Sequence, residues 1–144
     1  AARSAVAGMA ALIAERGAQV EVQAPVDPLR VNGDMSHLTR AISNLLGNAL
    51  KYGGEPPRVT IRLQRSASAV SVGVSDQGSG LAPSEIQHLF EPFYRGRRAS
   101  EAQIPGSGLG LALVKRIVES HGGGVHAENS PTGGALFTLE IPAA

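Results

Sequence analysis

Residues 34–54, DMSHLTRAISNLLGNALKYGG, carry the strongest structural signal of the chain. Apolar residues recur there at i, i+4, i+7, i+8 and i+11, which is the spacing of one face of an α-helix; they are Leu38, Ile42, Leu45, Leu46 and Ala49. Asp34 is a typical N-cap residue, and Gly53-Gly54 is a typical stop signal. The stretch therefore predicts an amphipathic helix from Asp34 to about Lys51.

A second face of this helix is polar. Asn44, Asn48 and Lys51 stand at i, i+4 and i+7, so two amides and an ammonium group share one side. Asparagine is unfavourable inside helices because its side chain competes for backbone hydrogen bonds. One interpretation is a solvated helix face. The other is that an amide oxygen binds Mg²⁺ while Lys51 meets a phosphate.

The flanking patterns predict a mixed α/β fold. A helical stripe covers residues 4–15, alternation predicts a strand at residues 20–24, and residues 59–63 and 70–74 have the pattern of a hairpin. A third helix is expected from Gly110 to the glycines at 122–124, followed by strands at 125–127 and 136–141 joined by a turn at 131–134. This order of elements favours a two-layer sandwich with a mixed sheet over a doubly wound parallel sheet.

Composition excludes several classes of function. The chain has 144 residues, a net charge of +1, no cysteine and no long basic run, so neither a disulfide framework, a cysteine-ligated metal nor a nucleic-acid footprint is expected. No apolar stretch approaches the roughly 18 to 20 residues that cross a bilayer. Since the chain begins without Met, we expect residues 1–8 to belong to the end of an upstream linker and residues 9–144 to form one domain.

Glycines cluster at two places where chemistry is plausible. Asp76-Gln77-Gly78-Ser79-Gly80 follows the second hairpin strand, and an ionised Asp76 there would accept a hydrogen bond from the amino group of adenine; a plain turn is the alternative. Gly106-Ser107-Gly108-Leu109-Gly110 precedes the third helix, where backbone N–H groups bind anions; a flexible linker is the alternative. Neither stretch has the spacing of a dinucleotide fingerprint or a P-loop.

The four histidines have no metal-ligand spacing, and no nucleophile motif is present. His37, at the start of the central helix, and His121, at the end of the third, are best interpreted as structural.

In their order along the chain these clusters resemble the ATP-binding catalytic domain of sensor histidine kinases, within the Bergerat-fold ATPases and kinases. The matching segments are residues 34–52 for the N box, 76–80 for the first glycine box, 90–95 for the F box, 106–111 for the second glycine box and 133–137 for the last. The resemblance implies a mostly antiparallel sheet of about five strands packed on three helices.

The resemblance also implies a site for ATP and Mg²⁺ between the central and third helices, under a lid at about residues 96–105. Asn44, Lys51 and Arg95 would have catalytic roles near the phosphates, and Asn48 would bind Mg²⁺. Further nucleotide contacts would come from Tyr52, Asp76, Gly78, Gly80, Gly106, Gly108, Leu109, Gly110 and Leu111. Phe90 and Phe93 would anchor the start of the lid. Ala135 departs from the pattern, because a hydroxyl residue often follows that glycine.

One position separates the reactions of this superfamily. Its hydrolysing members have a glutamate that activates water where this chain has Asn44, and an amide cannot serve as a general base. The resemblance therefore implies transfer of phosphate to a histidine, and none of the histidines here has the family's acceptor motif.

We accordingly expect an upstream dimerisation hairpin that carries the acceptor, a homodimer, a downstream response regulator and a membrane-anchored full-length protein with this domain in the cytoplasm. Alone, the domain is expected to bind nucleotide and to be nearly inert. The alternatives are a degenerate nucleotide-sensing module and a serine-directed kinase of the same superfamily; a chaperone-type or topoisomerase-type ATPase would need the missing glutamate.

Overall fold

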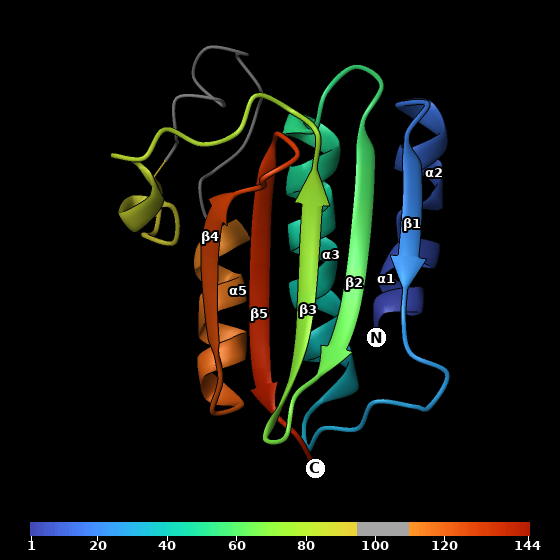
Figure 1. Ribbon diagram of the computed structural model, residues 1–144, viewed down its shortest axis with the longest axis vertical. Helices are drawn as coiled ribbons and strands as arrows, with labels where there is room; N and C mark the ends of the chain where they lie inside the picture. Colours follow the sequence, from blue (N-terminus) through green and yellow to red (C-terminus); the bar gives the residue numbers. More distant parts are fainter. Residues whose placement is uncertain (95–109) are drawn as a thin grey trace.

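A five-stranded sheet is covered on one face by helices in the computed structural model of the chain (Figure 1), which describes residues 1–94 and 110–144. The elements are α1 (Ala2–Gly8), α2 (Ala10–Glu15), β1 (Gln19–Gln23), α3 (Met35–Tyr52), β2 (Arg58–Arg65), β3 (Ala69–Asp76), the short 3₁₀ helix η1 (Ile86–His88), α5 (Gly110–Ser120), β4 (Gly124–Asn129) and β5 (Ala135–Pro142). The expected two-layer sandwich is confirmed. Among the described residues, no helix combines the length and the apolar character that a membrane span requires.

The strands lie in the order β1-β2-β3-β5-β4. β1 runs parallel to β2, and every other pair is antiparallel, so the sheet is mixed as expected. The expected hairpin is β2 and β3, whose register places Val59 opposite Asp76 at one end and Arg65 opposite Val70 at the other. Asp76 therefore ends a central strand, next to the start of β2.

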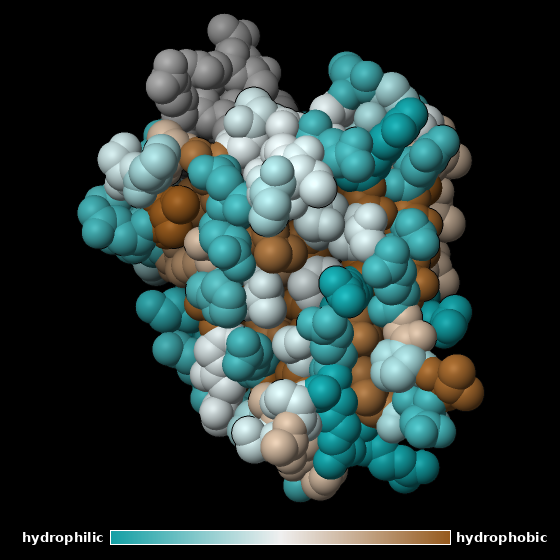
Figure 2. Space-filling model, viewed as in Figure 1, coloured by the Kyte–Doolittle hydropathy of each residue, from teal (hydrophilic) through white to brown (hydrophobic). Residues whose placement is uncertain are grey.

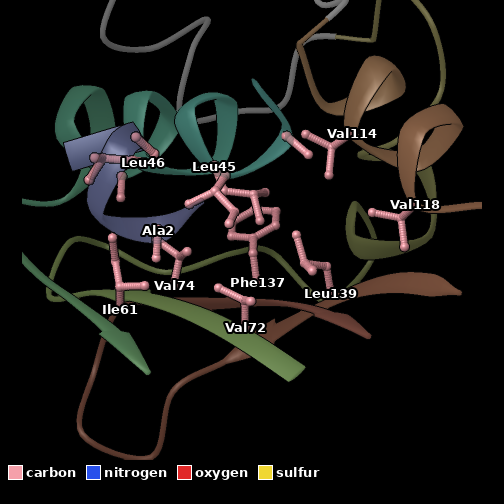
Figure 3. Close-up of a cluster of buried hydrophobic side chains, with 14 of the residues drawn as sticks. Ala2, Leu45, Leu46, Ile61, Val72, Val74, Val114, Val118, Phe137 and Leu139 are labelled. Atoms are coloured by element: carbon pink, nitrogen blue, oxygen red, sulfur yellow. The ribbon is translucent and has the colours of Figure 1, made fainter. Parts of the chain in front are cut away.

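The core lies between the sheet and the helices, as Figure 3 shows. Leu45 and Leu46 of α3 and Val114 of α5 point toward the inner face of the sheet, where Val74 and Phe137 meet them. Full burial of a Val, Leu or Phe side chain contributes about 1.5–3 kcal/mol each to stability. The apolar stripes of α3 and α5 therefore fix both helices on the sheet and leave their other faces for a site.

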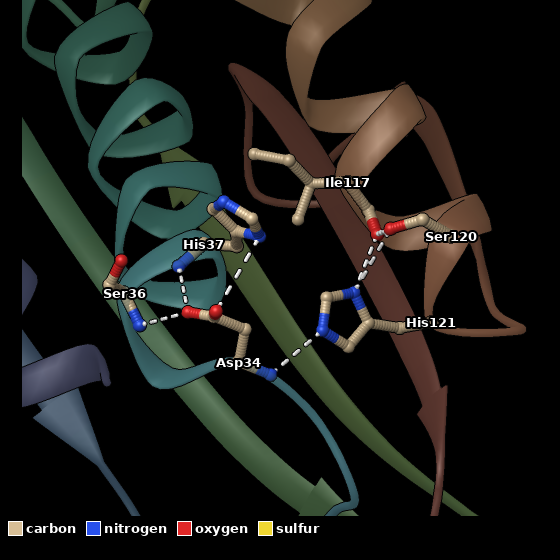
Figure 4. A network of polar contacts seen from close by, with 6 residues as sticks. All are labelled: Asp34, Ser36, His37, Ile117, Ser120 and His121. Atoms are coloured by element: carbon tan, nitrogen blue, oxygen red, sulfur yellow. Dashed lines mark hydrogen bonds and ion pairs between the residues drawn. The ribbon is translucent and has the colours of Figure 1, made fainter.

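The predicted cap of α3 is present (Figure 4). The Asp34 carboxylate accepts hydrogen bonds from the N–H groups of Ser36, at 2.9 Å, and His37, at 3.1 Å. The bond from the His37 N–H is the main reason that the pKa of Asp34 lies below its ordinary value. The central helix therefore begins where the sequence predicts.

His121 connects the end of α5 to this cap (Figure 4). Its Nε2 accepts a hydrogen bond from the Asp34 N–H at 3.1 Å, which makes the ring a donor at Nδ1, 2.7 Å from the carbonyl oxygen of Ile117. Gly33 leaves room for the ring, because a Cβ at that position would overlap it. The structural role expected for His121 is confirmed, and it joins two helices that are distant in sequence.

The first helix differs from the sequence prediction. Residues 4–15 were expected to form one helix, but α1 ends at Gly8 and α2 begins at Ala10, with Met9 at φ −109° between them. Glycine weakens a helix at this point, and Met9 packs against Gly47 of α3, where a Cβ would lie 3.3 Å from its terminal methyl. Ala2 and Ala5 are buried in the core, so residues assigned to a linker from the sequence contribute to the fold.

Candidate nucleotide-binding site

The polar face of α3 lies along the seam with α5. Asn44 and Asn48 are half-buried, and the Nδ2 of Asn44 donates a hydrogen bond to the carbonyl oxygen of Gly110 at 3.3 Å. Lys51, one turn further along α3, is exposed. The structure therefore brings the asparagine face against the first residue of α5, two features that the sequence predicts to share a site.

Asp76 is the buried charged residue of the described part of the chain, with 2% of its surface exposed. Its Oδ1 accepts hydrogen bonds from the backbone N–H groups of Gly78, at 3.0 Å, and Ala135, at 3.1 Å. Two fixed donors on one oxygen hold the carboxylate in a defined orientation. The first glycine box and the turn between β4 and β5 thus meet at this group, and Ala135 contacts it through its backbone.

Glycines allow three segments to converge on Asp76. A Cβ at Gly78 would overlap the carbonyl oxygen of Tyr52 at the end of α3, and one at Gly134 would overlap the carbonyl oxygen of Asp76 itself. A Cβ at Gly53 would lie 3.0 Å from that of Asp76. The sequence predicts that Gly78 allows a flat ligand to approach. In the structure, the lack of a side chain at Gly78 also allows its backbone to pack against that of Tyr52.

Asn129 holds the first glycine box in place, and the sequence analysis did not identify it. Its Oδ1 accepts from the Leu81 N–H at 2.6 Å, and its Nδ2 donates to the Leu81 carbonyl oxygen at 2.9 Å. Gly80, at φ +78°, lies so close that a Cβ would be 2.7 Å from the Asn129 oxygen. The only sequence signal was an asparagine at a strand end, which is common in ordinary turns.

The first residues of the F box are fixed to the core, but the later ones are not. The ring of Phe90 packs edge-to-face on Phe137, with centroids 6.2 Å apart. Phe93 is 70% exposed and has φ +65°, so its predicted role as an anchor is wrong in this structure. The ring centroids of Tyr94 and His88 lie 5.6 Å apart. Partial desolvation, together with nearby carboxylates, raises the pKa of the Tyr94 hydroxyl.

The structure describes some of the remaining predicted residues and not others. Tyr52 and Leu111 are half-buried on α3 and α5, on the two sides of the seam. Gly110 has open space where a Cβ would stand, so packing does not require a glycine there. The other predicted positions lie outside the described residues; they are Arg95, Gly106, Gly108, Leu109 and the lid at 96–105.

A metal would depend on the nucleotide here. Within residues 1–94 and 110–144, no group of three or more His, Cys, Asp or Glu side chains could hold a metal ion. Asn48 is half-buried, and an amide oxygen suits Mg²⁺, which commonly takes one or two protein ligands and completes its shell with phosphates and water. The residues present therefore fit a magnesium–nucleotide complex better than a free metal.

Both a family model and the sequences of curated proteins match this chain. Residues 33–144 match the family model described as "Histidine kinase-, DNA gyrase B-, and HSP90-like ATPase". The chain is 38% identical over 133 residues to the sensor-like histidine kinase SenX3 of Mycobacterium tuberculosis, a match that covers 91% of the chain and 32% of that protein. It thus spans about a third of the length of this curated relative.

Solved structures show the same fold. The mycobacterial sensor histidine kinase MprB superposes with a TM-score of 0.84 and 33% identity over 96% of this chain and 93% of that one. Full-length ShkA in complex with AMPPNP gives a TM-score of 0.85 and 28% identity, covering 99% of this chain and 29% of that one.

Proposed function

Because the chain belongs to the family of histidine kinase-, DNA gyrase B- and HSP90-like ATPases, we propose that it binds Mg-ATP and transfers the γ-phosphoryl group to a histidine on a separate dimerisation hairpin. The similarity to SenX3 and MprB supports the kinase branch of the family. The observation that carries the proposal is the buried carboxylate of Asp76, held by the backbone N–H groups of Gly78 and Ala135 at the end of β3.

The role proposed for Asp76 is to select adenine. An ionised carboxylate only accepts hydrogen bonds, so it suits an exocyclic amino group and rejects a carbonyl in the same place. Tyr52 lies at the end of α3, whose backbone packs against Gly78, and would contact the base. AMPPNP, the ligand named for the ShkA structure, is an ATP analogue, which supports an adenine nucleotide in a domain of this fold.

The phosphates are proposed to lie along the seam between α3 and α5. Asn48 would bind Mg²⁺, Lys51 would meet the phosphates as a point charge, and the first residues of α5 would present N–H groups. The metal neutralises charge on the β- and γ-phosphates when it is bound. Outside the described residues, Arg95 is proposed to meet the γ-phosphate. Gly106, Gly108 and Leu109 are proposed to complete the nucleotide contacts together with Gly80 and Leu111.

The chain's own residues favour transfer over hydrolysis. Asn44 occupies the position of the general base in hydrolysing relatives, and its amide donates to the Gly110 carbonyl oxygen. An amide cannot take a proton from water, so hydrolysis should be slow. Phosphoryl transfer needs chiefly position and charge neutralisation, and the imidazole nitrogen of an acceptor histidine would form the new bond as ADP leaves.

The acceptor is proposed to lie outside this chain. Both ring nitrogens of His121 form hydrogen bonds with backbone groups. The Nδ1 of His88 lies 2.8 Å from the Oε1 of Glu91. We propose that an upstream hairpin in a homodimer carries the acceptor histidine. A response regulator would then receive the phosphate. A membrane anchor elsewhere in a longer protein, with this domain in the cytoplasm, belongs to the same proposal.

Calorimetry tests the nucleotide site. ADP and ATP are titrated into the chain with and without Mg²⁺, together with Asp76→Asn and Asn48→Asp. Asn can still accept the two backbone N–H groups, so loss of adenine binding in Asp76→Asn, but not in the exposed loop control Asp27→Asn, supports base recognition. Asn48→Asp should change the Mg²⁺ dependence rather than the fold.

A transfer assay separates the kinase from its alternatives. The chain is mixed with the acceptor hairpin of its own full-length protein and labelled ATP, and phosphohistidine is measured by its acid lability. Nucleotide binding without phosphohistidine would favour a sensing module, and acid-stable phosphoserine on a protein substrate would favour the serine-directed class.

A further inference from the structure

β1 is shorter than its partner and leaves the end of β2 uncovered. The parallel pairing stops at Gln23 opposite Arg62, whereas β2 continues to Arg65 and is paired there with β3 alone. Among the described residues, no strand lies against the outer side of residues 63–65. The sheet therefore has a short open edge next to its edge strand.

Pro25 explains why β1 cannot extend along this edge. The Gln19 N–H donates to the Pro57 carbonyl oxygen at 3.0 Å, so every second residue of β1 donates to β2. The next donor in that series would be residue 25, which is proline and has no N–H. By the same alternation, the carbonyl group of Leu63 and the N–H of Arg65 face the open side.

A groove of about 670 Å³ lies at this edge. Pro25, Pro28 and Leu29 of the loop after β1 form one wall, and residues 62–65 of β2 form the other. Ligand pockets commonly have volumes of about 300–1,000 Å³, so the space suits a short peptide segment. Leu63, on the inner side of β2, supplies an apolar surface within it.

The groove is basic. Arg62 and Arg65 stand on alternate sides of the strand, Asp27 is the one carboxylate of the lining, and neither arginine forms an ion pair within the described residues. With its amide oriented to accept, Gln64 places its oxygen 3.2 Å from both Nε and Nη2 of Arg62 and steadies that guanidinium group. Guanidinium groups bind carboxylates in preference to other side chains.

We propose that this edge of β2 is a docking site for an extended acidic segment of a partner protein, which adds as a short strand. The partner backbone would donate to the Leu63 carbonyl oxygen and accept from the Arg65 N–H, and its carboxylates would meet the arginines. Charge complementarity commits the site to an acidic segment. Figure 2, viewed as Figure 1, shows hydrophilic residues across the open face of the sheet, with apolar residues between them.

The site is separate from the proposed nucleotide site. Val59 of β2 lies opposite Asp76, and Arg65 is six positions further along the strand. At about 3.3 Å per residue the two places are roughly 20 Å apart along the strand. A segment bound at this edge would therefore leave the nucleotide site accessible.

Titration with a model peptide, followed by NMR of the labelled chain, tests the proposal. The probe is the end-blocked peptide Glu-Glu-Val-Glu-Glu, whose neighbouring carboxylates project on both faces of an extended strand, with Lys-Lys-Val-Lys-Lys as its charge-reversed partner. The acidic probe is expected to shift the amide signals of residues 63–65 and of the non-proline residues among 23–29 saturably, and to leave ADP affinity unchanged. Arg62→Glu combined with Arg65→Glu should weaken binding of the acidic peptide by about tenfold or more.

Two controls keep the result specific. Arg58→Glu reverses an exposed charge on the same strand outside the groove and should leave peptide binding unchanged. A probe N-methylated at its internal amides keeps its charges but cannot donate backbone hydrogen bonds, so it should bind at least about tenfold more weakly. Equal binding of the methylated or the basic probe, or no shift in residues 63–65 at millimolar peptide, would overturn the proposal.

Discussion

Replacing Gly134 by alanine is expected to damage both the fold and the proposed nucleotide site, and Gly133 offers an adjacent control. Both glycines have positive φ, +98° at Gly133 and +80° at Gly134. A methyl group at Gly133 would meet nothing within 4 Å. At Gly134 it would overlap the carbonyl oxygen of Asp76 and lie 2.8 Å from the Oδ1 of that carboxylate.

The expected magnitudes follow from this difference. A non-glycine residue in the left-handed region costs about 1–2 kcal/mol, which is the whole effect expected for Gly133→Ala. Gly134→Ala adds overpacking against backbone atoms, about 1–3 kcal/mol, for a total of about 2–5 kcal/mol. For a chain of this size each kcal/mol corresponds to about 3 °C, so the melting temperature should fall by about 6–15 °C for Gly134→Ala and about 3–6 °C for Gly133→Ala.

Urea unfolding and ADP calorimetry on the two variants decide the matter. Gly134→Ala should also weaken ADP binding beyond Gly133→Ala, because the neighbouring Ala135 N–H is one of the donors that hold Asp76. Equal unfolding free energies for the two variants, within about 0.5 kcal/mol, would show that the β4–β5 turn does not press on Asp76. Equal ADP affinities at unequal stabilities would show that Asp76 is not the base contact.

Other contacts yield further predictions. His121→Gln loses the ring's hydrogen bonds with two backbone groups and should lower the free energy of unfolding in urea by about 1–2 kcal/mol. The control His126→Gln, at an exposed position of β4, should change that free energy by less than about 0.5 kcal/mol. Asn129→Ala removes both hydrogen bonds to Leu81 and should cost about 1–2 kcal/mol while weakening ADP binding; unchanged affinity would restrict the residue to a structural role. Asp34 has a pKa lowered by folding, so its contribution is present above the unfolded value of 3.8 and is lost as pH falls through the folded value. Asp34→Asn keeps a capping side chain but should flatten that acid limb of a melting-temperature profile from pH 6 to pH 2.5, and parallel profiles for the two proteins would contradict this assignment.

Local patterns were sufficient to predict the elements that form the body of the fold. The apolar spacing from Leu38 to Ala49 places α3 correctly, and the alternation around Val59 and Val72 places the β2–β3 hairpin. These elements bury the faces that their own periodicity defines, so distant residues have little power to change them. The order of the motifs predicted the family, and the contact between Asn44 and Gly110 confirms that two of those motifs meet.

Contacts between distant residues could not be predicted in the same way. Asn129 and Leu81 are 48 positions apart, and their pairing depends on how β4 is placed beside the first glycine box. The break at Met9 likewise depends on Gly47 of α3, a residue that the periodicity of residues 4–15 does not contain. The prediction that Phe93 anchors the lid was wrong for a related reason. The residue has a positive φ, and its ring is exposed to solvent.

The glycines show how far a motif can support a function. Gly78 and Gly134 are required by backbone packing around Asp76, so a family member that had lost its activity would still need them to fold. Lys51 is exposed, Asn48 lies on the half-buried face of α3, and Gly110 has open space around it, so packing explains these three residues less well. The phosphate and Mg²⁺ contacts proposed above would supply a physical reason for that combination on neighbouring helix faces. Variants of Asn48 and Lys51 therefore discriminate a working kinase domain from a degenerate one more sharply than variants of the glycine boxes.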